Sequence, residues 1–507
     1  MARCVPILFL SAALALPGLP SAAPLASEQQ AVHVLNRLAF GPRPGDVERV
    51  QRMGVQAWID EQLHPEAIPL PASLGMRLDG LDTVRRGAGA SLAEFLALRK
   101  AVRMEDEDAK QRRRLAEARV AREANEARLW RAIDSPRQLE EVMADFWYNH
   151  FNVFSGKGID RALVTSYENE AIRPHVLGSF RALLGATAKH PAMLHYLDNA
   201  VSSARGVNEN YARELMELHT LGVDGGYAQR DVTELARMLT GWTFEQRRLA
   251  NGGEGFRFEP KRHDRGTKTW LGQVIQPAGQ QEGEHALDVL AVHPTTARHV
   301  SRQLAQYFVS DDPPRALVER MAKTWRETGG DIRSVLRTLF TSEEFMSTEA
   351  AGAKFKTPYQ FVVSAARAGA VPVANVQPLV GTMTQLGMPL YGCQTPDGYK
   401  NTQDAWLNPD ALTRRITFAT ALAGGRLPLS LPPVSPPPQP LPAAVDVSMA
   451  ALPAAAPSAP KMPALDPDAL QAALGASVSR RTLDIVQQKP DKLRAAMLLG
   501  SPDFMQR

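Results

Sequence analysis

The chain has 507 residues, of which 44% are hydrophobic and 22% are charged. This length is enough for a sizeable core, and the composition is that of a globular protein, which excludes disorder throughout the chain. The formal net charge of +4 is too small to indicate a nucleic-acid-binding protein. The two cysteines, Cys4 and Cys393, lie far apart in the sequence, which excludes a CxxC redox or metal motif.

Residues 1–23 have the features of a secretory signal peptide. Arg3 supplies a positive charge, residues 5–16 are almost entirely apolar, and residues 21–23 are small. The apolar run is too short to span a membrane permanently. No later segment reaches about 18 continuous apolar residues, so we expect no permanent membrane anchor. The sequence therefore predicts a protein that is exported to the periplasm or to the extracellular medium.

Signals for the start of a helix recur between residues 24 and 426, and we expect this range to form an all-α, multi-helical body. In each signal a capping residue precedes a first-turn proline or a Gln or Glu three positions later. The pairs are Ser27 with Gln30, Ser135 with Gln138, Asp231 with Glu234, Thr357 with Pro358, and Asn408 with Pro409. Apolar residues between positions 139 and 147 follow the spacing of an amphipathic helix.

Residues 245–283 interrupt this helical pattern and contain a glycine-rich stretch. Alternating strand patterns are scarce elsewhere, and the best candidates, residues 256–258 and 269–271, both lie inside this range. We therefore expect a long insertion with one short β-hairpin.

Residues 103–128 include 15 charged residues of both signs. The simplest interpretation is a solvated helix that is stabilised by ion pairs between residues four positions apart. A partner-binding coiled coil is the alternative, because Met104, Leu115 and Val120 could form an apolar seam.

Residues 427–465 are rich in proline and alanine and predict an extended linker. The final segment, residues 466–507, returns to a helical pattern and ends with Phe504 and Met505. Burying such apolar side chains stabilises a protein by about 1.5–3 kcal/mol each. We therefore expect this C-terminal segment to dock on the helical body.

Several blocks of the sequence resemble the bacterial domain-of-unknown-function family 1800. They are residues 35–42, 146–153, 208–222, 231–242, 263–264, 354–367 and 501–504. The second block reads FWYNHFNV and the third reads NENYARELMELHTLG, and both are long enough to be specific. The resemblance extends over nearly the whole mature chain.

The resemblance implies an exported protein with a helical body. It also implies a partner, a secreted protein resembling sulfatases and alkaline phosphatases that is encoded nearby, and it implies no established reaction. Many family members carry a Pro-Pro-Asn-Val-type turn followed by Gly-Trp before the last core helix. Residues 395–399 of this chain read Thr-Pro-Asp-Gly-Tyr instead.

Two ionisable residues of the third block, Glu214 and His219, fall within the apolar arc of a helical wheel. Arg213 and Glu217 fall outside that arc. A buried carboxylate is costly unless it is paired, so the simplest interpretation is that Glu214 binds an arginine and His219 binds a core carbonyl. A functional site is the alternative. The two side chains would lie about 140° apart on the wheel, which disfavours a shared metal ion on this helix alone.

His263 and Asp264 are the best loop candidates for chemistry, because loops on a rigid scaffold often carry functional residues. A surface turn is the alternative interpretation. We hypothesise that this pair closes an interior pocket containing Glu214 and His219. As a loop residue, His263 should be replaceable by alanine with little change in melting temperature.

Two classes of function remain open from the sequence. The first is an accessory or binding protein of the bacterial envelope that acts with the neighbouring secreted protein. The second is a metal-dependent or acid/base hydrolase that uses Glu214, His219, His263 and Asp264. The sequence contains no Gly-x-Ser-x-Gly nucleophile motif and identifies no cofactor.

Overall fold

The computed structural model describes residues 25–103, 107–430 and 462–507. The chain is all-α, as predicted, with 62% of it helical and two small antiparallel sheets in the described part. The predicted signal peptide and most of the predicted linker lie outside the described residues. None of the described helices has both the length and the apolar composition needed to cross a bilayer.

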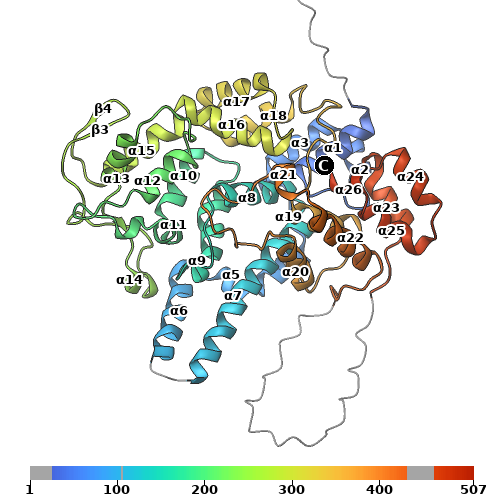
Figure 1. Ribbon diagram of the computed structural model, residues 1–507, viewed down its shortest axis with the longest axis horizontal. Helices are drawn as coiled ribbons and strands as arrows, with labels where there is room; N and C mark the ends of the chain where they lie inside the picture. The colour runs from blue at the N-terminus through green and yellow to red at the C-terminus, as the bar shows by residue number, and fades with distance from the viewer. Residues whose placement is uncertain (1–24, 104–106, 431–461) are drawn as a thin grey trace, which may run out of the picture.

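The elements follow one another in the order shown in Figure 1. Those of the first half are α1 (Ser27–Leu38), α2 (Asp46–Met53), α3 (Val55–Leu63), η1 (Pro65–Ala67), α4 (Ala72–Asp79), α5 (Asp82–Arg85), α6 (Ala88–Arg103), α7 (Glu107–Asp134), α8 (Gln138–His150), α9 (Asp160–Ser166), η2 (Tyr167–Ile172), η3 (Arg173–His175), α10 (Phe180–Lys189), α11 (Pro191–Tyr196), η4 (Asn199–Val201), α12 (Asn210–Glu217), α13 (Gln229–Met238), β1 (Trp242–Thr243) and α14 (Gln246–Ala250). Those of the second half are β2 (Arg257–Phe258), β3 (Lys268–Trp270), β4 (Gln273–Ile275), α15 (Gln280–Val292), α16 (Pro294–Phe308), α17 (Arg315–Thr328), α18 (Ile332–Phe340), α19 (Pro358–Ala368), α20 (Gln377–Gln385), α21 (Gln403–Trp406), α22 (Pro409–Ala423), α23 (Pro467–Leu474), η5 (Gly475–Ser477), α24 (Arg480–Gln487), α25 (Asp491–Leu499) and α26 (Pro502–Met505).

Helices α8 and α19 lie at the centre of the molecule (Figure 1). Eleven of the 13 residues of α8 and all 11 residues of α19 are buried, as expected of helices that are covered on every side. In Figure 1, α16, α17 and α18 run along the top, α12, α13 and α15 lie on the left, and α22 to α25 lie on the right. The polar residues of α8 are therefore held inside the molecule.

Two of the predicted helix caps are confirmed. The Thr357 side chain accepts a hydrogen bond from the backbone N–H of Gln360, and Asn408 accepts one from Ala411. Both helices, α19 and α22, have proline in the first turn, where its missing N–H costs no helical hydrogen bond.

The other three predicted caps are displaced by one to three residues. Ser27 is the first residue of α1 rather than its cap, and α8 begins only at Gln138, three residues after Ser135. Asp231 is the third residue of α13, and its carboxylate accepts a hydrogen bond from the Ala228 N–H. In α13 the acidic side chain therefore reaches back to the helix start instead of preceding it.

From Glu107 onward the charged run forms α7, which packs against α6 in a helical hairpin that projects from the body (Figure 1). Met104 of the alternative apolar seam lies outside the described residues. Leu115 is 54% exposed, as expected for a solvated helix. The same interpretation is wrong where α7 enters the body, because Glu123, Glu126 and Arg128 are buried there. The charges of this half of α7 hold the fold together rather than facing water.

The insertion contains one hairpin, as predicted, formed by β3 and β4. The other candidate strand, β2, pairs with β1 instead. The hairpin is fixed to α13 by the residues that were predicted to cap that helix. Asp231 accepts a hydrogen bond from the Leu271 N–H at 2.8 Å, and Glu234 accepts one from the Thr269 N–H at 3.1 Å.

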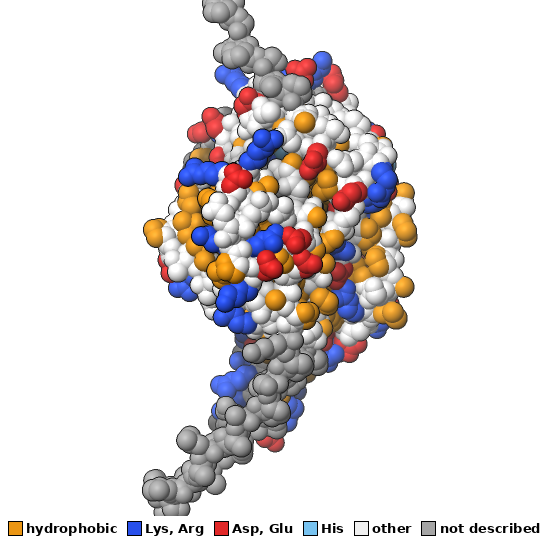
Figure 2. Space-filling model, turned by 90° about the vertical axis from the view of Figure 1, so that its right-hand side faces the viewer, with side chains coloured by type: hydrophobic (Ala, Val, Ile, Leu, Met, Phe, Trp, Pro, Cys, Tyr) orange, Lys and Arg blue, Asp and Glu red, His pale blue; other side chains and the backbone are white. Residues whose placement is uncertain are grey.

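The C-terminal helices pack against α19 and α22. Phe504 is 3% exposed, and its ring lies 5.7 Å from that of Phe361 and 3.8 Å from the ammonium of Lys356. The Lys356 N–H also donates to the carbonyl of Met505 at 2.8 Å. Figure 2 views the face that carries these helices, where basic and acidic side chains lie interspersed and form no block of one charge.

We expect Phe504→Ala to lower the free energy of unfolding by about 3–5 kcal/mol, because it leaves a cavity in a closed apolar contact. Chemical denaturation measures this change. Ile485→Ala on α24 is the matched control, because Ile485 is 46% exposed. It should change stability by less than about 1 kcal/mol. Equal losses in the two variants would show that the C-terminal anchor contributes nothing specific.

Candidate functional site

Glu214 lies half-buried on α12. The predicted pairing of its carboxylate with an arginine is not found among the described residues. No ion pair or side-chain hydrogen bond joins its carboxylate to another described residue. Arg213 binds Glu209 and Glu217 instead, each at 3.2 Å. Burial and then the neighbouring Glu217 raise the pKa of Glu214. Glu214 is therefore a half-buried carboxyl group on α12 that no described ion pair or hydrogen bond holds in place.

His219 is only 1% exposed but lies beyond the end of α12, so the helical wheel does not apply to it. Its ring lies 5.0 Å from that of Phe151, and its Nε2 has no hydrogen-bond partner among the described residues. Burial holds the pKa of His219 well below its usual range. Its backbone carbonyl, rather than its ring, makes the core hydrogen bond, at 3.1 Å from Nε2 of His150.

His263 lies in a buried cluster rather than on an open loop. Its Nε2 is 3.0 Å from Oε1 of Glu282, and its Nδ1 is 2.9 Å from the carbonyl oxygen of Thr240. The other Glu282 oxygen lies 2.7 Å from Nζ of Lys268, and the side chains of Lys268 and Glu282 are both fully buried. This cluster holds the insertion against α15.

Asp264 also makes structural contacts within the protein. Its carboxylate binds Arg237 on α13 through two hydrogen bonds, at 2.9 and 3.1 Å, and this contact lowers the pKa of Asp264. No described hydrogen bond, ion pair or ring contact joins His263 or Asp264 to Glu214 or His219. The structure therefore does not bring the four predicted residues together in one pocket.

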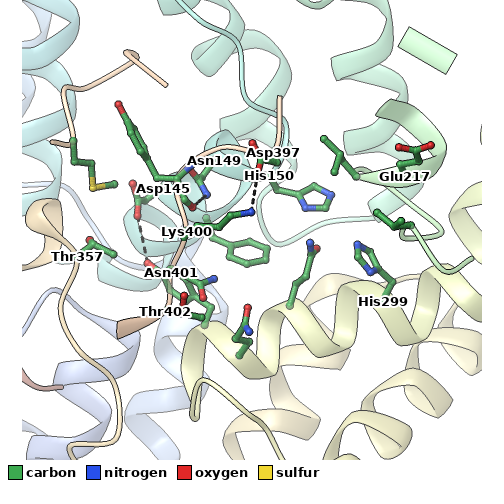
Figure 3. Close-up of a pocket in the computed structure, with 18 residues that line it drawn as sticks. Asp145, Asn149, His150, Glu217, His299, Thr357, Asp397, Lys400, Asn401 and Thr402 are labelled. Atoms are coloured by element: carbon green, nitrogen blue, oxygen red, sulfur yellow. Dashed lines mark hydrogen bonds and ion pairs between the residues drawn. The ribbon is translucent and has the colours of Figure 1, made fainter. Parts of the chain in front are cut away.

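A different cavity, which we call the central pocket, lies beside α8 and encloses about 360 Å³ (Figure 3). This volume is within the range of small-molecule binding sites. Four segments that are distant in sequence form most of its walls: α8, residues 217–223, α16 and residues 388–402. Thr357 at the start of α19 completes the lining. Polar residues that line it include Asp145, Asn149, His150, Glu217, His299, Gln303, Asp397, Lys400 and Asn401.

Asn149 fastens one wall of the central pocket. Its Oδ1 accepts a hydrogen bond from the Tyr399 N–H at 2.7 Å, and its Nδ2 donates to the Tyr399 carbonyl at 2.8 Å. Gly398 has a φ of +68°, and a Cβ there would collide with the Asn149 carbonyl oxygen. Only glycine allows this close approach. The turn at residues 395–399 is thus part of the pocket.

Asp145 connects the central pocket to a buried ion-pair network. Its carboxylate lies 2.7 Å from Arg128, which also lies 3.3 Å from Glu168. The hydroxyl of Tyr307 donates to the other Asp145 oxygen at 3.4 Å (Figure 3). Burial raises the pKa of Asp145 although Arg128 opposes the shift. The network fixes the Asp145 side chain in the pocket wall.

Both histidines that line the pocket favour the neutral form. Burial lowers the pKa of His150 to about 3, although its contact with the His219 carbonyl opposes the shift. Burial also lowers the pKa of His299. Within the described residues, no three His, Cys, Asp or Glu side chains are placed to hold one metal ion.

The sequence contains a signal for two of the pocket residues. Asp145 immediately precedes the FWYNHFNV block and Asn149 lies within it, four positions later. In a helix this spacing puts them on one face, so a helical wheel like that for residues 211–221 indicates an inward polar pair here too.

The chain matches the family described as "Protein of unknown function (DUF1800)" over residues 33–506. It therefore belongs to that family, which confirms the resemblance seen in the sequence. No curated protein and no solved structure matches the chain.

We expect His263→Ala to lower the free energy of unfolding by about 2–4 kcal/mol, because it leaves a cavity and removes the ring contacts to the Glu282 carboxylate and the Thr240 carbonyl. This reverses the expectation from the sequence that the change would be neutral. Lys261→Ala, two positions away and exposed, is the matched control. Thermal melting of the two variants decides the point, and two unchanged melting temperatures would contradict the buried cluster.

We also expect His150 to make stability depend on pH. Because folding favours its neutral form, its contribution is present above about pH 6.5 and is lost as the pH falls toward 3. His150→Gln keeps a donor for the His219 carbonyl but does not titrate. Between pH 7 and pH 4 the variant should lose about 2–3 kcal/mol less stability than the parent.

Urea denaturation at the two pH values measures this difference. His285→Gln, at an exposed position on α15, serves as the control. Equal losses in the parent and His150→Gln would show that burial of this imidazole does not govern the acid response.

Proposed function

We propose that this DUF1800 protein is exported and acts as an accessory or binding protein of the bacterial envelope, with its ligand held in the central pocket. The observation that carries the proposal is the convergence of four distant segments on one polar cavity of small-molecule size. Convergent polar groups in a preformed concave site are typical of ligand-binding sites.

The rigidity of the pocket walls supports binding. Asn149 holds residues 398–399 through both of its amide atoms, and Arg128 holds Asp145. A site that is fixed before the ligand arrives loses less conformational entropy on binding.

We assign contact with the neighbouring secreted protein to the α6–α7 hairpin. It projects from the body in Figure 1, and Arg112 and Arg114 on its outer part are exposed. Exposed charges on a projecting element favour electrostatic recognition of a partner protein. The predicted signal peptide of residues 1–23 supports export to the compartment where such a partner would be met.

The alternative, a hydrolase that uses Glu214, His219, His263 and Asp264, is less well supported. His263 and Asp264 are bound to Glu282 and Arg237, away from the other two residues. A general acid and base need mutual access to one substrate, and these four side chains do not share a cavity.

Native mass spectrometry of the protein purified from its own host tests ligand binding. We expect a small molecule to co-purify with the parent and to be lost from Val223→Trp. Val223 lines the central pocket and is 71% exposed, so a larger side chain narrows the entrance without disturbing the core. Val274→Trp is the matched control, at a 63% exposed valine on β4. Equal ligand content in both variants would refute binding at this pocket.

Export is tested separately by the intact mass of protein recovered from the periplasm or medium. The expected mature chain begins near Pro24. Soluble folded protein that retains Met1 would contradict the predicted processing.

A further inference from the structure

Three buried polar atoms of the central pocket have no hydrogen-bond partner among the described residues. They are Nε2 of His299, Oε1 of Gln303 and Oδ1 of Asn401. His299 and Gln303 lie on α16, and Asn401 lies on the segment that faces it across the cavity (Figure 3). A buried polar atom without a partner costs about 1–3 kcal/mol, so native proteins contain few of them. Their gathering at one cavity indicates hydrogen bonds to a bound molecule.

The charged groups of the pocket are already paired within the protein. Asp145 binds Arg128 at 2.7 Å, Asp397 binds Lys400 at 2.7 Å, and Glu217 binds Arg213 at 3.2 Å. His150 and His299 add no net charge, because burial lowers the pKa of each. An ionic ligand would lose its hydration and find no unpaired counter-charge, which disfavours both cations and anions.

The remaining polar groups match hydroxyl groups. A hydroxyl donates one hydrogen bond and accepts others, and amide side chains and neutral imidazoles also offer both functions. The oxygens of Gln303 and Asn401 require a donor, and their amide N–H groups offer one in return. Phe146 and Tyr399 line the same cavity and provide apolar surface for the carbon skeleton of a ligand.

We infer that the central pocket binds a neutral saccharide. This inference rests on the proposed binding function and specifies its ligand class. The paired charges disfavour an ion, the two unpartnered acceptor oxygens match hydroxyl donors, and the aromatic side chains accommodate a ring with an apolar face. Gln303 and Asn401 are the residues that select the ligand by hydrogen bonding.

Isothermal titration calorimetry with the full mature chain tests the inference. The saccharide probes are cellobiose, maltose and N,N′-diacetylchitobiose, with spermidine as the cationic probe and citrate as the anionic probe. We expect saturable binding of at least one disaccharide and none of spermidine or citrate. Gln303→Leu and Asn401→Ala should each weaken that binding about tenfold or more, as expected for the loss of one well-formed hydrogen bond.

Gln385→Leu is the control, because Gln385 is exposed on α20 outside the pocket. It should leave the affinity unchanged, and melting curves confirm that each variant is folded. Binding of spermidine or citrate alone would overturn the saccharide inference and leave the proposed binding function standing. Saccharide binding that neither pocket variant weakens would overturn the assignment to this pocket. Failure of every probe, together with no co-purified molecule in native mass spectrometry, would overturn both proposals.

Discussion

The buried guanidinium of Arg128 is the contact on which the centre of the molecule depends. It lies between the carboxylates of Asp145 and Glu168, and the hydroxyl of Tyr391 donates to Glu168 at 2.7 Å. The rings of Tyr148 and Tyr391 lie 5.1 and 5.2 Å from it. A buried charge is tolerated only with such complete pairing, because its loss of hydration is expensive. This one side chain therefore fixes the relative positions of α7, α8, the π-helical turn η2 and the loop that contains Tyr391.

The same constraint creates the pocket. α8 is buried on nearly every side, so its polar residues must find partners in the protein or face an internal cavity. Asp145 binds Arg128 on one side and lines the cavity on the other, and Asn149 is occupied by the backbone of Tyr399. The π-helical turn that presents Glu168 to Arg128 is an uncommon conformation that is frequent at functional sites. The pairing of the buried polar residues of α8 thus both stabilises the core and shapes the pocket.

The structural features that depend on residues close together in the sequence could be predicted from it. The caps at Thr357 and Asn408 were predictable because their partners lie three positions away, and the helicity of the charged run follows from its local spacing. The family resemblance correctly indicated the extent of the domain match, residues 33–506. The helix at α8 was predicted as well, but its apolar spacing indicated an amphipathic helix with one buried face, whereas eleven of its 13 residues are buried.

The candidate site was not predictable to the same extent, because its contacts join residues far apart in the chain. Asn149 and Tyr399 are 250 positions apart, and His263 and Glu282 are 19 apart on different elements. A helical wheel identifies a residue that points inward but not its partner. It also fails where the helix ends, as at His219, which follows α12 by two residues. His263 was predicted as a loop residue because nothing in its neighbourhood indicated the buried Lys268 and Glu282.

The turn at residues 395–399 places different requirements on its neighbouring positions. Asn149 binds only the backbone N–H and carbonyl of residue 399, which every residue except proline provides. The side chain at that position is therefore free to vary as far as this contact is concerned. Gly398 is not free to vary, since its positive φ and the adjacent Asn149 carbonyl leave no room for a Cβ. The requirement that closes the pocket is thus placed on Gly398 and on Asn149 rather than on the side chain of Tyr399.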